Sequence, residues 1–304
     1  MVNSRLKKKY VFLGDVNSIN IEIIIKSFKS LKYKIQYILI GSKKDLIKYL
    51  IKINSNISVN EINDPIDFKN FDKNYLNIFN IENVSKFKYL NLINQIKISN
   101  FLSSKTNIDL VTMPINKSIF KKKINFNGIT EFLGELNYTK TIMMMMGNNF
   151  SVIPYTTHIN PKFISKSITE RQLNNFFKRI LKILNNQKYF HFKKINFICY
   201  NPHCGEDGTM GNEDIIIKKT MQKYKMINGP FSADSAFSDI KNKALYITTY
   251  HDQGLIPFKA LNDKKINITL GLNYKRLSPA HGTAQDIKFK DKADISSYLS
   301  CMMF

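Results

Sequence analysis

Apolar strand-like runs and helix-like segments alternate along this chain. The stretch 8–31 predicts a strand, a tight turn and a helix, and the stretch 34–53 repeats the same order. Further strands are predicted by the apolar runs at 108–114, 141–147, 150–158, 194–203 and 244–252. Residues 168–186 have apolar positions at helical spacing, with Thr169 as a helix N-cap. This alternation is typical of an α/β fold.

The length of the chain limits the number of domains, and its cysteines indicate the redox compartment. The 304 residues exceed the usual size of one hydrophobic core, so we expect either two domains or one large α/β unit. Cys199, Cys204 and Cys301 form no Cys-x-x-Cys pair, and their odd number argues against a disulfide framework, which favours the reducing cytoplasm. No apolar run is long enough for a signal-peptide core or a membrane helix, and we expect no membrane association.

The chain is strongly basic, with a formal net charge of +23. Such a charge can favour binding to nucleic acid or to an anionic membrane surface. Here the lysines are spread over the whole length among asparagine and isoleucine, a mixture that favours drift toward A/T-rich codons. No basic stretch is interleaved with aromatic residues as in a single-strand binding platform, so a nucleic-acid partner is disfavoured. Attraction of an anionic small substrate stays open.

Four predicted strands end in reactive residue types: Lys117, His158, His203 and His251. Ligands of open α/β folds bind at the carboxyl ends of strands, where residues distant in sequence converge. Any one of these histidines could be a packed or hydrogen-bonded residue. The three together predict a divalent metal site, and neutral imidazole suits zinc, nickel, cobalt or iron better than magnesium.

Other residues in these segments could orient or bind a substrate. Asp252 follows His251 directly and could orient a ligand histidine, act as a base, or simply cap a turn. Lys117, Lys259 and Arg276 are candidates for binding an anionic substrate. Arg276 stands in an Arg-x-Ser-Pro turn, and a guanidinium can hold a phosphate or carboxylate in two-pronged geometry.

Three glycines follow His203, at positions 205, 208 and 211. Gly205, Gly208 and Gly211 have the spacing of a flexible anion-binding loop, yet they match neither the Walker nor the dinucleotide fingerprint, and the chain contains no G-x-G-x-x-G. A nucleotide cofactor would therefore bind outside the usual Rossmann mode.

Seven segments form an ordered series from about Val11 to Tyr298. They are TMPINK, GITEFLGEL, YTTHI, NPHCGEDGTMGNED, GPFSADSAF, YHDQGLIPFK and NITLGLNYKRLSPAHGTAQDI. In this order they closely resemble the 4-hydroxythreonine-4-phosphate dehydrogenase family of pyridoxal phosphate biosynthesis. The resemblance implies two α/β/α domains with a cleft between them, as in isocitrate and isopropylmalate dehydrogenases. We expect residues 1–126 and 268–304 in the first domain and 127–267 in the second.

The resemblance also implies roles for single residues. It makes His158, His203 and His251 the metal ligands, with zinc as the first choice and magnesium or cobalt as alternatives. It places Thr130, Lys259, Asn267 and Arg276 at the substrate. We assign Asp252 and Lys117 to catalysis, and Gly205, Gly208, Gly211 and His281 to the cofactor, NAD or NADP. A homodimer whose active site draws on both subunits is implied as well.

The implied reaction is the NAD-dependent oxidation of 4-phosphohydroxy-L-threonine. Its β-keto acid product decarboxylates to 3-amino-2-oxopropyl phosphate, on the way to pyridoxal 5'-phosphate. Two alternatives remain: a related dehydrogenase for a phosphorylated sugar acid such as 4-phospho-threonate, and a decayed enzyme kept as a basic binding protein.

Two of the chain's departures from the family pattern concern segments of the candidate site. Ile129 stands where the family has a substrate-contacting histidine, and isoleucine can neither donate a hydrogen bond nor titrate. The glycine- and proline-rich turn of the family is replaced by GDVNSINIE, in which Gly14, Asp15 and Glu22 remain. Reduced activity or an altered substrate is a hypothesis that follows from Ile129.

Overall fold

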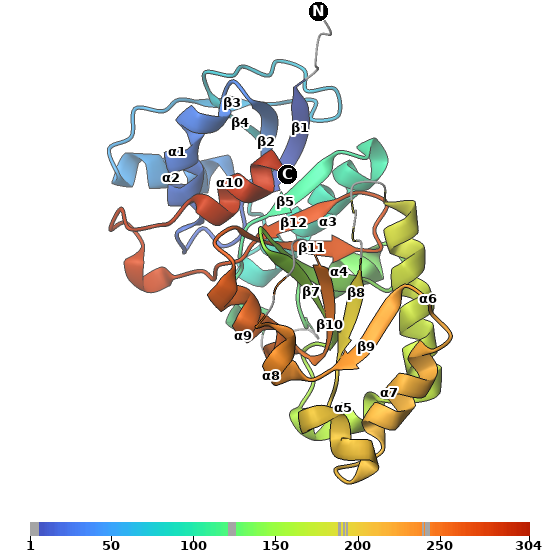
Figure 1. Cartoon of the computed structure of the whole chain (residues 1–304). Helices are drawn as coiled ribbons and strands as arrows, with labels where there is room; N and C mark the ends of the chain where they lie inside the picture. Colours follow the sequence, from blue (N-terminus) through green and yellow to red (C-terminus); the bar gives the residue numbers. More distant parts are fainter. Residues whose placement is uncertain are drawn as a thin grey trace, which may run out of the picture. The chain divides into compact units, whose positions relative to one another are not determined.

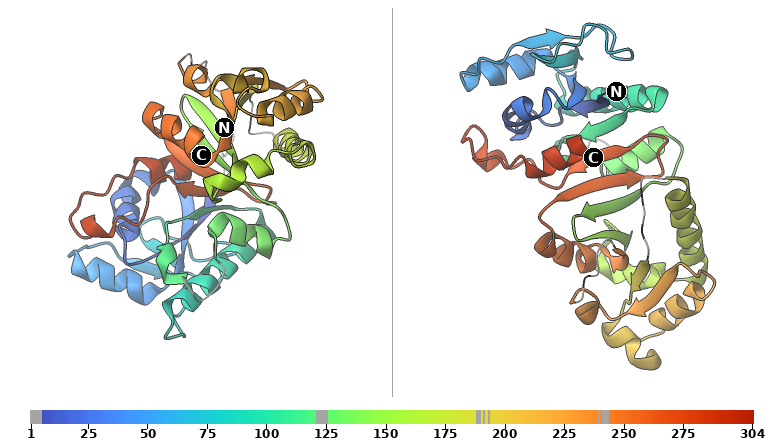
Figure 2. Two further views of the ribbon diagram at one scale, coloured as in Figure 1. Left: turned by 90° about the horizontal axis from the view of Figure 1, so that it is seen from below. Right: turned by 45° about the horizontal axis from the view of Figure 1, so that its top comes forward.

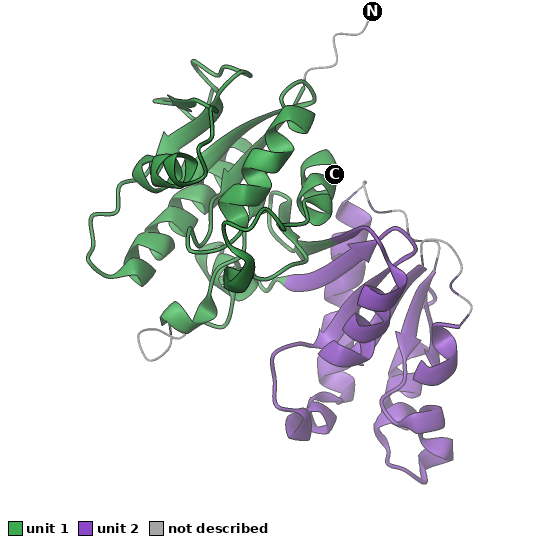
Figure 3. Ribbon diagram, turned by 90° about the vertical axis from the view of Figure 1, so that its left-hand side faces the viewer, with its two compact units in different colours: residues 1–141, 266–304 green, residues 142–265 purple. Residues whose placement is uncertain are grey.

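The computed structural model describes residues 6–120, 126–187, 190, 192, 194–238, 240 and 244–304. The chain divides into two units, which Figure 3 shows in different colours. Unit 1 comprises Met1–Thr141 and Ile266–Phe304, and unit 2 comprises Ile142–Lys265. The predicted α/β class is confirmed (Figure 1). No helix in the described ranges is long and apolar enough to cross a bilayer.

Unit 1 is built on strands in the order β3-β4-β2-β1-β5-β12-β11. Their bounds are β1 Lys7–Phe12, β2 Ile35–Gly41, β3 Val59–Glu61, β4 Leu76–Asn80, β5 Asp109–Thr112, β11 Lys265–Leu270 and β12 Arg276–Pro279. All neighbours in this order are parallel except β11, which runs antiparallel to β12. The chain thus returns after residue 265 to complete a sheet that it began at residue 7.

The helices of unit 1 cover both faces of this sheet. They are α1 Asn20–Leu31, α2 Lys43–Lys52, α3 Lys88–Thr106, α4 Ile129–Leu136 and α10 Ser296–Met303, with short 3-10 helices η1 Lys117–Phe120 and η4 Gln285–Ile287. The crossover from β1 to β2 leads to one side of β1, and the crossover from β4 to β5 leads to the other. Right-handed crossovers then place α1 and α3 on opposite faces, as Figures 1 and 2 show. The topological switch point lies between β1 and β5.

Unit 2 contains strands in the order β6-β7-β10-β8-β9. They are β6 Ile142–Gly147, β7 Phe150–Thr156, β8 Ile195–Ile198, β9 Ile227–Phe231 and β10 Ala244–Tyr250. Strands β6 and β7 form an antiparallel pair, and β7, β10, β8 and β9 are parallel. The helices are α5 Ile164–Ser167, α6 Glu170–Asn186, α7 Glu213–Met221, α8 Ala233–Ala236 and α9 His251–Leu261, with 3-10 helices η2 Pro161–Phe163 and η3 Pro202–Gly208.

Helix α6 shows how the local sequence sets an element. The hydroxyl of Thr169 accepts a hydrogen bond from the backbone N–H of Gln172, so the predicted N-cap is confirmed. Leu173, Phe176, Phe177 and Ile180 recur at helical spacing, and all four are buried. The helix therefore covers the sheet of unit 2 with one apolar face.

Helix α4 begins at Ile129, three residues after the predicted end of the first domain segment at residue 126. Ile129 and Leu133, which lie just after residue 126, belong to the apolar cluster of unit 1 together with Tyr10 and Phe12 of β1. The domain boundary at 126/127 stays a prediction, while the packing of α4 associates residues 129–136 with the first unit.

Candidate active site

His158 and His251 lie close together in unit 2. Strands β7 and β10 are parallel neighbours with Thr156 opposite Tyr250, so their carboxyl ends lie side by side. His158 follows the first strand and His251 follows the second. Their imidazole rings lie 5.7 Å apart between centroids. The strand-end pattern thus brings two of the three predicted metal ligands together.

His203 is presented differently, on the 3-10 segment that follows β8. Its side chain is 63% exposed, and its Nδ1 lies 4.0 Å from the carboxylate of Asp234. Across the described ranges, no three or more histidine, cysteine or acidic side chains are grouped closely enough to hold a metal ion. Among the described residues, the contact between two predicted ligands is that of the His158 and His251 rings.

The carboxylate of Asp252 contacts the imidazole of its neighbour. Asp252 Oδ1 lies 2.7 Å from His251 Nδ1, and the carboxylate is largely exposed. When Nδ1–H donates to a carboxylate, the tautomer is fixed and Nε2 is left as the free lone pair. Of the three roles considered for Asp252, this contact favours the orientation of a ligand histidine.

Two acidic residues hold the loop that leads to His203. The carboxylate of Asp214 is buried and accepts the backbone N–H groups of Tyr200, at 2.7 Å, and Asn201, at 2.9 Å. Glu213 accepts hydrogen bonds from the Asn201 amide and the Ser165 hydroxyl, and the Ser165 hydroxyl is the main cause that lowers the pKa of Glu213. These acids were not predicted as loop anchors, although they open helix α7, where carboxylates are favoured.

The glycines of this loop have a structural role that the backbone shows directly. Residues 203–207 all have positive φ, an unusual run for side chains other than glycine. Gly205 has φ +77°, and a Cβ there would lie 3.3 Å from the Asp214 carboxylate. Gly211 has φ +130°, and a Cβ there would lie 2.4 Å from Glu213 Oε2. Together with Gly208, also at positive φ, they let the loop fold over its two acids.

Arg276 is a buried cation of unit 1 that three threonine hydroxyls contact. It begins strand β12, is only 3% exposed, and donates from Nε to Thr112 Oγ1 at 2.8 Å. Its Nη1 donates to the hydroxyls of Thr269, at 3.0 Å, and Thr130, at 3.2 Å. Burial lowers the pKa of Arg276 to about 10, so the guanidinium stays charged at neutral pH. Strands β5, β11 and β12 and helix α4 thus converge on one buried cation.

Two more predicted residues of unit 1 lie on neighbouring elements. Asn267 is on β11, opposite Ser278 of β12, and its buried Oδ1 has no hydrogen-bond partner among the described residues. Lys117 begins η1 after β5. A Cβ built on Gly128 would lie 3.5 Å from Lys117 Nζ and 2.7 Å from Glu131 Oε2, so both charged groups lie over this glycine. Glu131 was not predicted.

Ile129 is part of the core rather than of a polar surface. It is 8% exposed and belongs to the apolar cluster that includes Phe120 and Leu133. Its neighbour Thr130 supplies the hydroxyl that contacts Arg276. The residue that replaces the family histidine therefore stabilises helix α4 by apolar packing.

His281 and Lys259 complete the predicted set. His281 Nδ1 lies 2.8 Å from the Gly282 carbonyl, and its buried Nε2 has no partner among the described residues. Burial lowers the pKa of His281, which favours a neutral ring. Lys259 is an exposed residue of α9, in unit 2. Asn267, Arg276 and His281 belong to unit 1, so the predicted residues are distributed over both units.

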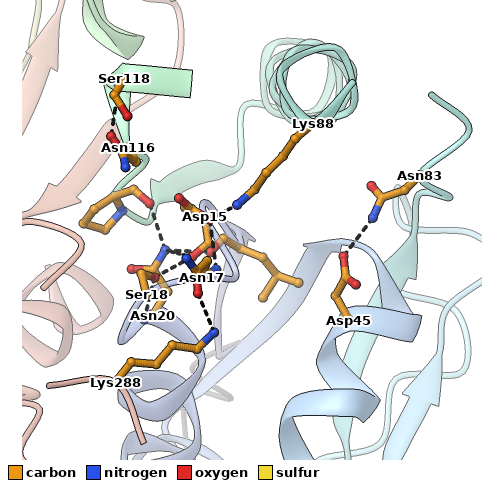
Figure 4. A network of polar contacts seen from close by, with 12 residues as sticks. Asp15, Asn17, Ser18, Asn20, Asp45, Asn83, Lys88, Asn116, Ser118 and Lys288 are labelled. Carbon is orange, nitrogen blue, oxygen red and sulfur yellow. Dashed lines mark hydrogen bonds and ion pairs between the residues drawn. The ribbon is translucent and has the colours of Figure 1, made fainter. Parts of the chain in front are cut away.

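A polar network replaces the glycine-rich family turn after β1 (Figure 4). Asp15 is fully buried, and its Oδ1 accepts hydrogen bonds from Lys88 Nζ, at 2.6 Å, and the Asn17 N–H, at 2.9 Å. Lys288 Nζ donates to the Asn17 side chain at 3.0 Å. Asn20 donates to the carbonyls of Leu13 and Pro114, which joins the ends of the β1 and β5 segments. Side chains here supply contacts that sequence patterns did not reveal.

A separate hollow of unit 1 contains none of the predicted site residues. It has a volume of about 730 Å³ and lies where β2 and β4 end, with Ser42, Lys43, Asp45, Asn80 and Glu82 in its lining. The first turn of α2 is already satisfied there, because Asn80 accepts the Lys43 N–H and Ser42 accepts the Asp45 N–H.

Comparison with known proteins gives consistent matches over nearly the whole chain. The model of a family described as pyridoxal phosphate biosynthetic protein PdxA matches residues 33–304. A 4-hydroxythreonine-4-phosphate dehydrogenase from Sulfurihydrogenibium sp. (strain YO3AOP1) is 33% identical over 312 residues, which cover 97% of this chain and 96% of the relative. The protein of the same name from Hydrogenobaculum sp. (strain Y04AAS1) is 34% identical over 297 residues, covering 94% of each chain.

A solved structure shows the same fold. The crystal structure of 4-hydroxythreonine-4-phosphate dehydrogenase from Klebsiella pneumoniae superimposes with a TM-score of 0.78 at 24% sequence identity, covering 97% of each chain. At this identity the similarity concerns the fold.

Proposed function

The chain belongs to the family of the pyridoxal phosphate biosynthetic protein PdxA, and we propose on this basis that it is a 4-hydroxythreonine-4-phosphate dehydrogenase. The substrate is 4-phosphohydroxy-L-threonine, and the oxidant is NAD or NADP. The observation that carries the proposal in the structure is the paired imidazoles of His158 and His251 at the carboxyl ends of parallel strands. They lie in segments that carry the family resemblance.

The donor set fits a divalent metal that two subunits share. His158 and His251 offer two imidazoles within one chain, and the contact with Asp252 leaves His251 Nε2 as a lone pair. His203 is 63% exposed beside the Asp234 carboxylate, so the third ligand would be His203 of the partner subunit. We propose a homodimer with zinc as the preferred ion, and magnesium or cobalt as alternatives. When bound, the metal supplies positive charge that lowers the pKa of the substrate alcohol.

Residues of the chain supply the remaining chemistry. Arg276, held by three threonine hydroxyls, offers a fixed cation for the anionic substrate, and Lys259 offers a second. Lys117 accepts the hydroxyl proton while hydride leaves the carbinol carbon for the cofactor. The β-keto acid then loses carbon dioxide, the electrons of the broken C–C bond form an enolate, and the proton that Lys117 took from the hydroxyl is added to the enolate carbon to give the ketone.

For the cofactor we propose His281 as a binding residue. Its segment is held to the β1–α1 turn, because the Thr283 carbonyl accepts the Ile19 N–H at 3.2 Å. The turn lies next to the switch point between β1 and β5, where open α/β sheets bind ligands. Gly205, Gly208 and Gly211 remain predictions for the cofactor, in addition to their role in the loop backbone.

The test is NADH formation by the purified protein with 4-phosphohydroxy-L-threonine, before and after chelation and metal add-back. We expect turnover that chelation removes and metal restores. Absence of turnover from folded, metal-loaded protein contradicts the proposal. Turnover with 4-phospho-threonate instead supports the alternative substrate.

A further inference from the structure

A chain of hydrogen bonds runs across the carboxyl ends of three neighbouring strands in unit 2. The hydroxyl of Thr156, at the end of β7, donates to the Thr249 carbonyl of β10 at 2.7 Å. The Thr249 N–H and hydroxyl both donate to Gln253 Oε1, each at 2.9 Å. Gln253 Nε2 donates to the Cys199 carbonyl, just after β8, at 2.8 Å. We call these four residues the strand-end belt.

Each strand of the belt leads into one of the three histidines. His158 follows Thr156, His251 follows Thr249, and His203 follows Cys199, each within four residues. The strand order β7-β10-β8 makes the belt continuous from one side of β10 to the other. The belt therefore connects the backbone segments that present all three imidazoles.

The belt lies in a buried environment, where a lost hydrogen bond is expensive. Thr249 is fully buried, Cys199 is 1% exposed and Thr156 is 7% exposed. Without the Gln253 side chain, the Thr249 N–H and the Cys199 carbonyl lose these hydrogen bonds in a region of low water access.

The Gln253 side chain must offer an acceptor to Thr249 and a donor to Cys199 at the same time, which a side-chain amide does. Gln253 Oε1 accepts two hydrogen bonds from Thr249, while Nε2 donates one to Cys199. A carboxylate keeps the acceptor and loses the donor, and an apolar side chain loses both. Gln253 also stands in the first turn of α9, two residues after His251, so its hydrogen bond to Cys199 links the start of that helix to the end of β8.

We propose that Gln253 is a positioning residue for the metal-binding histidines. It fixes the ends of β10 and β8 to each other, and Thr249 extends the connection to β7 through Thr156. The result is a set spacing between the segments that carry His158 and His251, and a fixed starting point for the loop that would present His203 to the partner subunit. This inference rests on the proposed function, because it assumes that these histidines bind a divalent metal.

The test compares Gln253→Met and Gln253→Glu with wild type and with Gln222→Met, an exposed glutamine of the same unit. Zinc affinity is measured by competition with a chromophoric chelator, and the ligand field by the visible spectrum of the cobalt-substituted protein. Thermal unfolding without metal reports on the fold. These readouts do not depend on turnover.

We expect Gln253→Met to bind zinc at least about tenfold more weakly and to show an altered cobalt spectrum. Gln253→Glu should fall between it and wild type, because it keeps the contacts to Thr249. Gln222→Met should match wild type. If Gln253→Met does not fold, Gln253→Glu decides the question by the same two readouts.

Wild-type zinc affinity and an unchanged cobalt spectrum in the folded variants overturn the role of Gln253 and leave the proposed function intact. A wild-type protein that binds neither zinc nor cobalt overturns the proposed metal site, and with it this inference.

Discussion

Arg276 donates from Nε to the hydroxyl of Thr112 at 2.8 Å, and this contact joins strand β12 to its parallel neighbour β5. Thr112 is fully buried. With Thr269 and Thr130 on Nη1, the hydroxyls hold two of the three guanidinium nitrogens and fix the plane of the group. A cation placed in this way loses little side-chain entropy when it meets an anionic substrate.

Thr112→Val removes one of these hydroxyls with little change in volume. We expect KM for the phosphorylated substrate to rise by about tenfold, because a charge-assisted hydrogen bond that orients Arg276 is lost. Steady-state kinetics measure the effect. Thr112→Ser keeps the hydroxyl and should restore most of the affinity. An unchanged KM in Thr112→Val contradicts the orienting role.

His158→Ala and His203→Ala test whether the metal site is shared between subunits. Each variant alone should fold and lose metal-dependent turnover. In a shared site, mixing and reassembling the two inactive proteins gives heterodimers with one complete set of histidines, and about a quarter of wild-type activity returns. Recovery of no activity from verified heterodimers indicates that each chain binds the metal by itself.

Asp214→Asn tests the anchor of the loop that carries His203. The carboxylate accepts two backbone N–H groups in a buried setting, so replacing it should destabilise the protein by ~1–3 kcal/mol. Chemical denaturation measures this loss, and zinc affinity should fall as well. Asp207→Asn, an exposed change in the same loop, is the matched control. Equal stability of the two variants speaks against the anchor.

The pKa of Glu213 predicts a pH dependence of stability. The Ser165 hydroxyl lowers this pKa below its ordinary value of 4.5. A carboxyl group with a lowered folded-state pKa stabilises the protein fully above its unfolded pKa, and this contribution is lost as pH falls through the folded-state value. Wild type should therefore exceed Glu213→Gln in Tm near neutral pH, and the difference should shrink as the pH falls below the ordinary carboxyl value of 4.5. A difference that grows on acidification contradicts the assignment.

Ile129→His tests whether the family histidine can simply be restored. Since Ile129 is buried in the apolar cluster that includes Phe120 and Leu133, we expect the polar ring to lower the free energy of unfolding by ~1–3 kcal/mol. We expect no gain in kcat/KM. Ile129→Val is the volume control and should cost less. A stable variant with higher kcat/KM shows instead that this position faces the substrate.

Much of the architecture followed from sequence patterns, because those patterns are local. Alternating apolar runs predicted the α/β class, and Thr169 predicted the start of α6. Strand β9, with the sequence INGPF, was not predicted, since glycine and proline disfavour a strand and only pairing with β8 defines it.

The candidate site was predicted only in part. Strand-end histidines could be found by their position after apolar runs, and two of them do meet. The partners of Arg276 and the contacts of Asp214 and Gln253 could not be found in this way. Thr112 lies far from Arg276 in sequence, and its hydroxyl is one among many until β5 and β12 pair.

Unit 1 is made of two chain segments that are separated by unit 2, and this affects how the protein folds during translation. Strand β5 ends at Thr112, yet its neighbour β12 begins only at Arg276, after all of unit 2 has been made. On the ribosome, unit 2 is continuous and can fold as soon as it emerges, while unit 1 must wait with an open sheet edge for its last two strands. Translation thus sets an order in which the histidine segments form before Arg276 can meet the hydroxyls of Thr112 and Thr130.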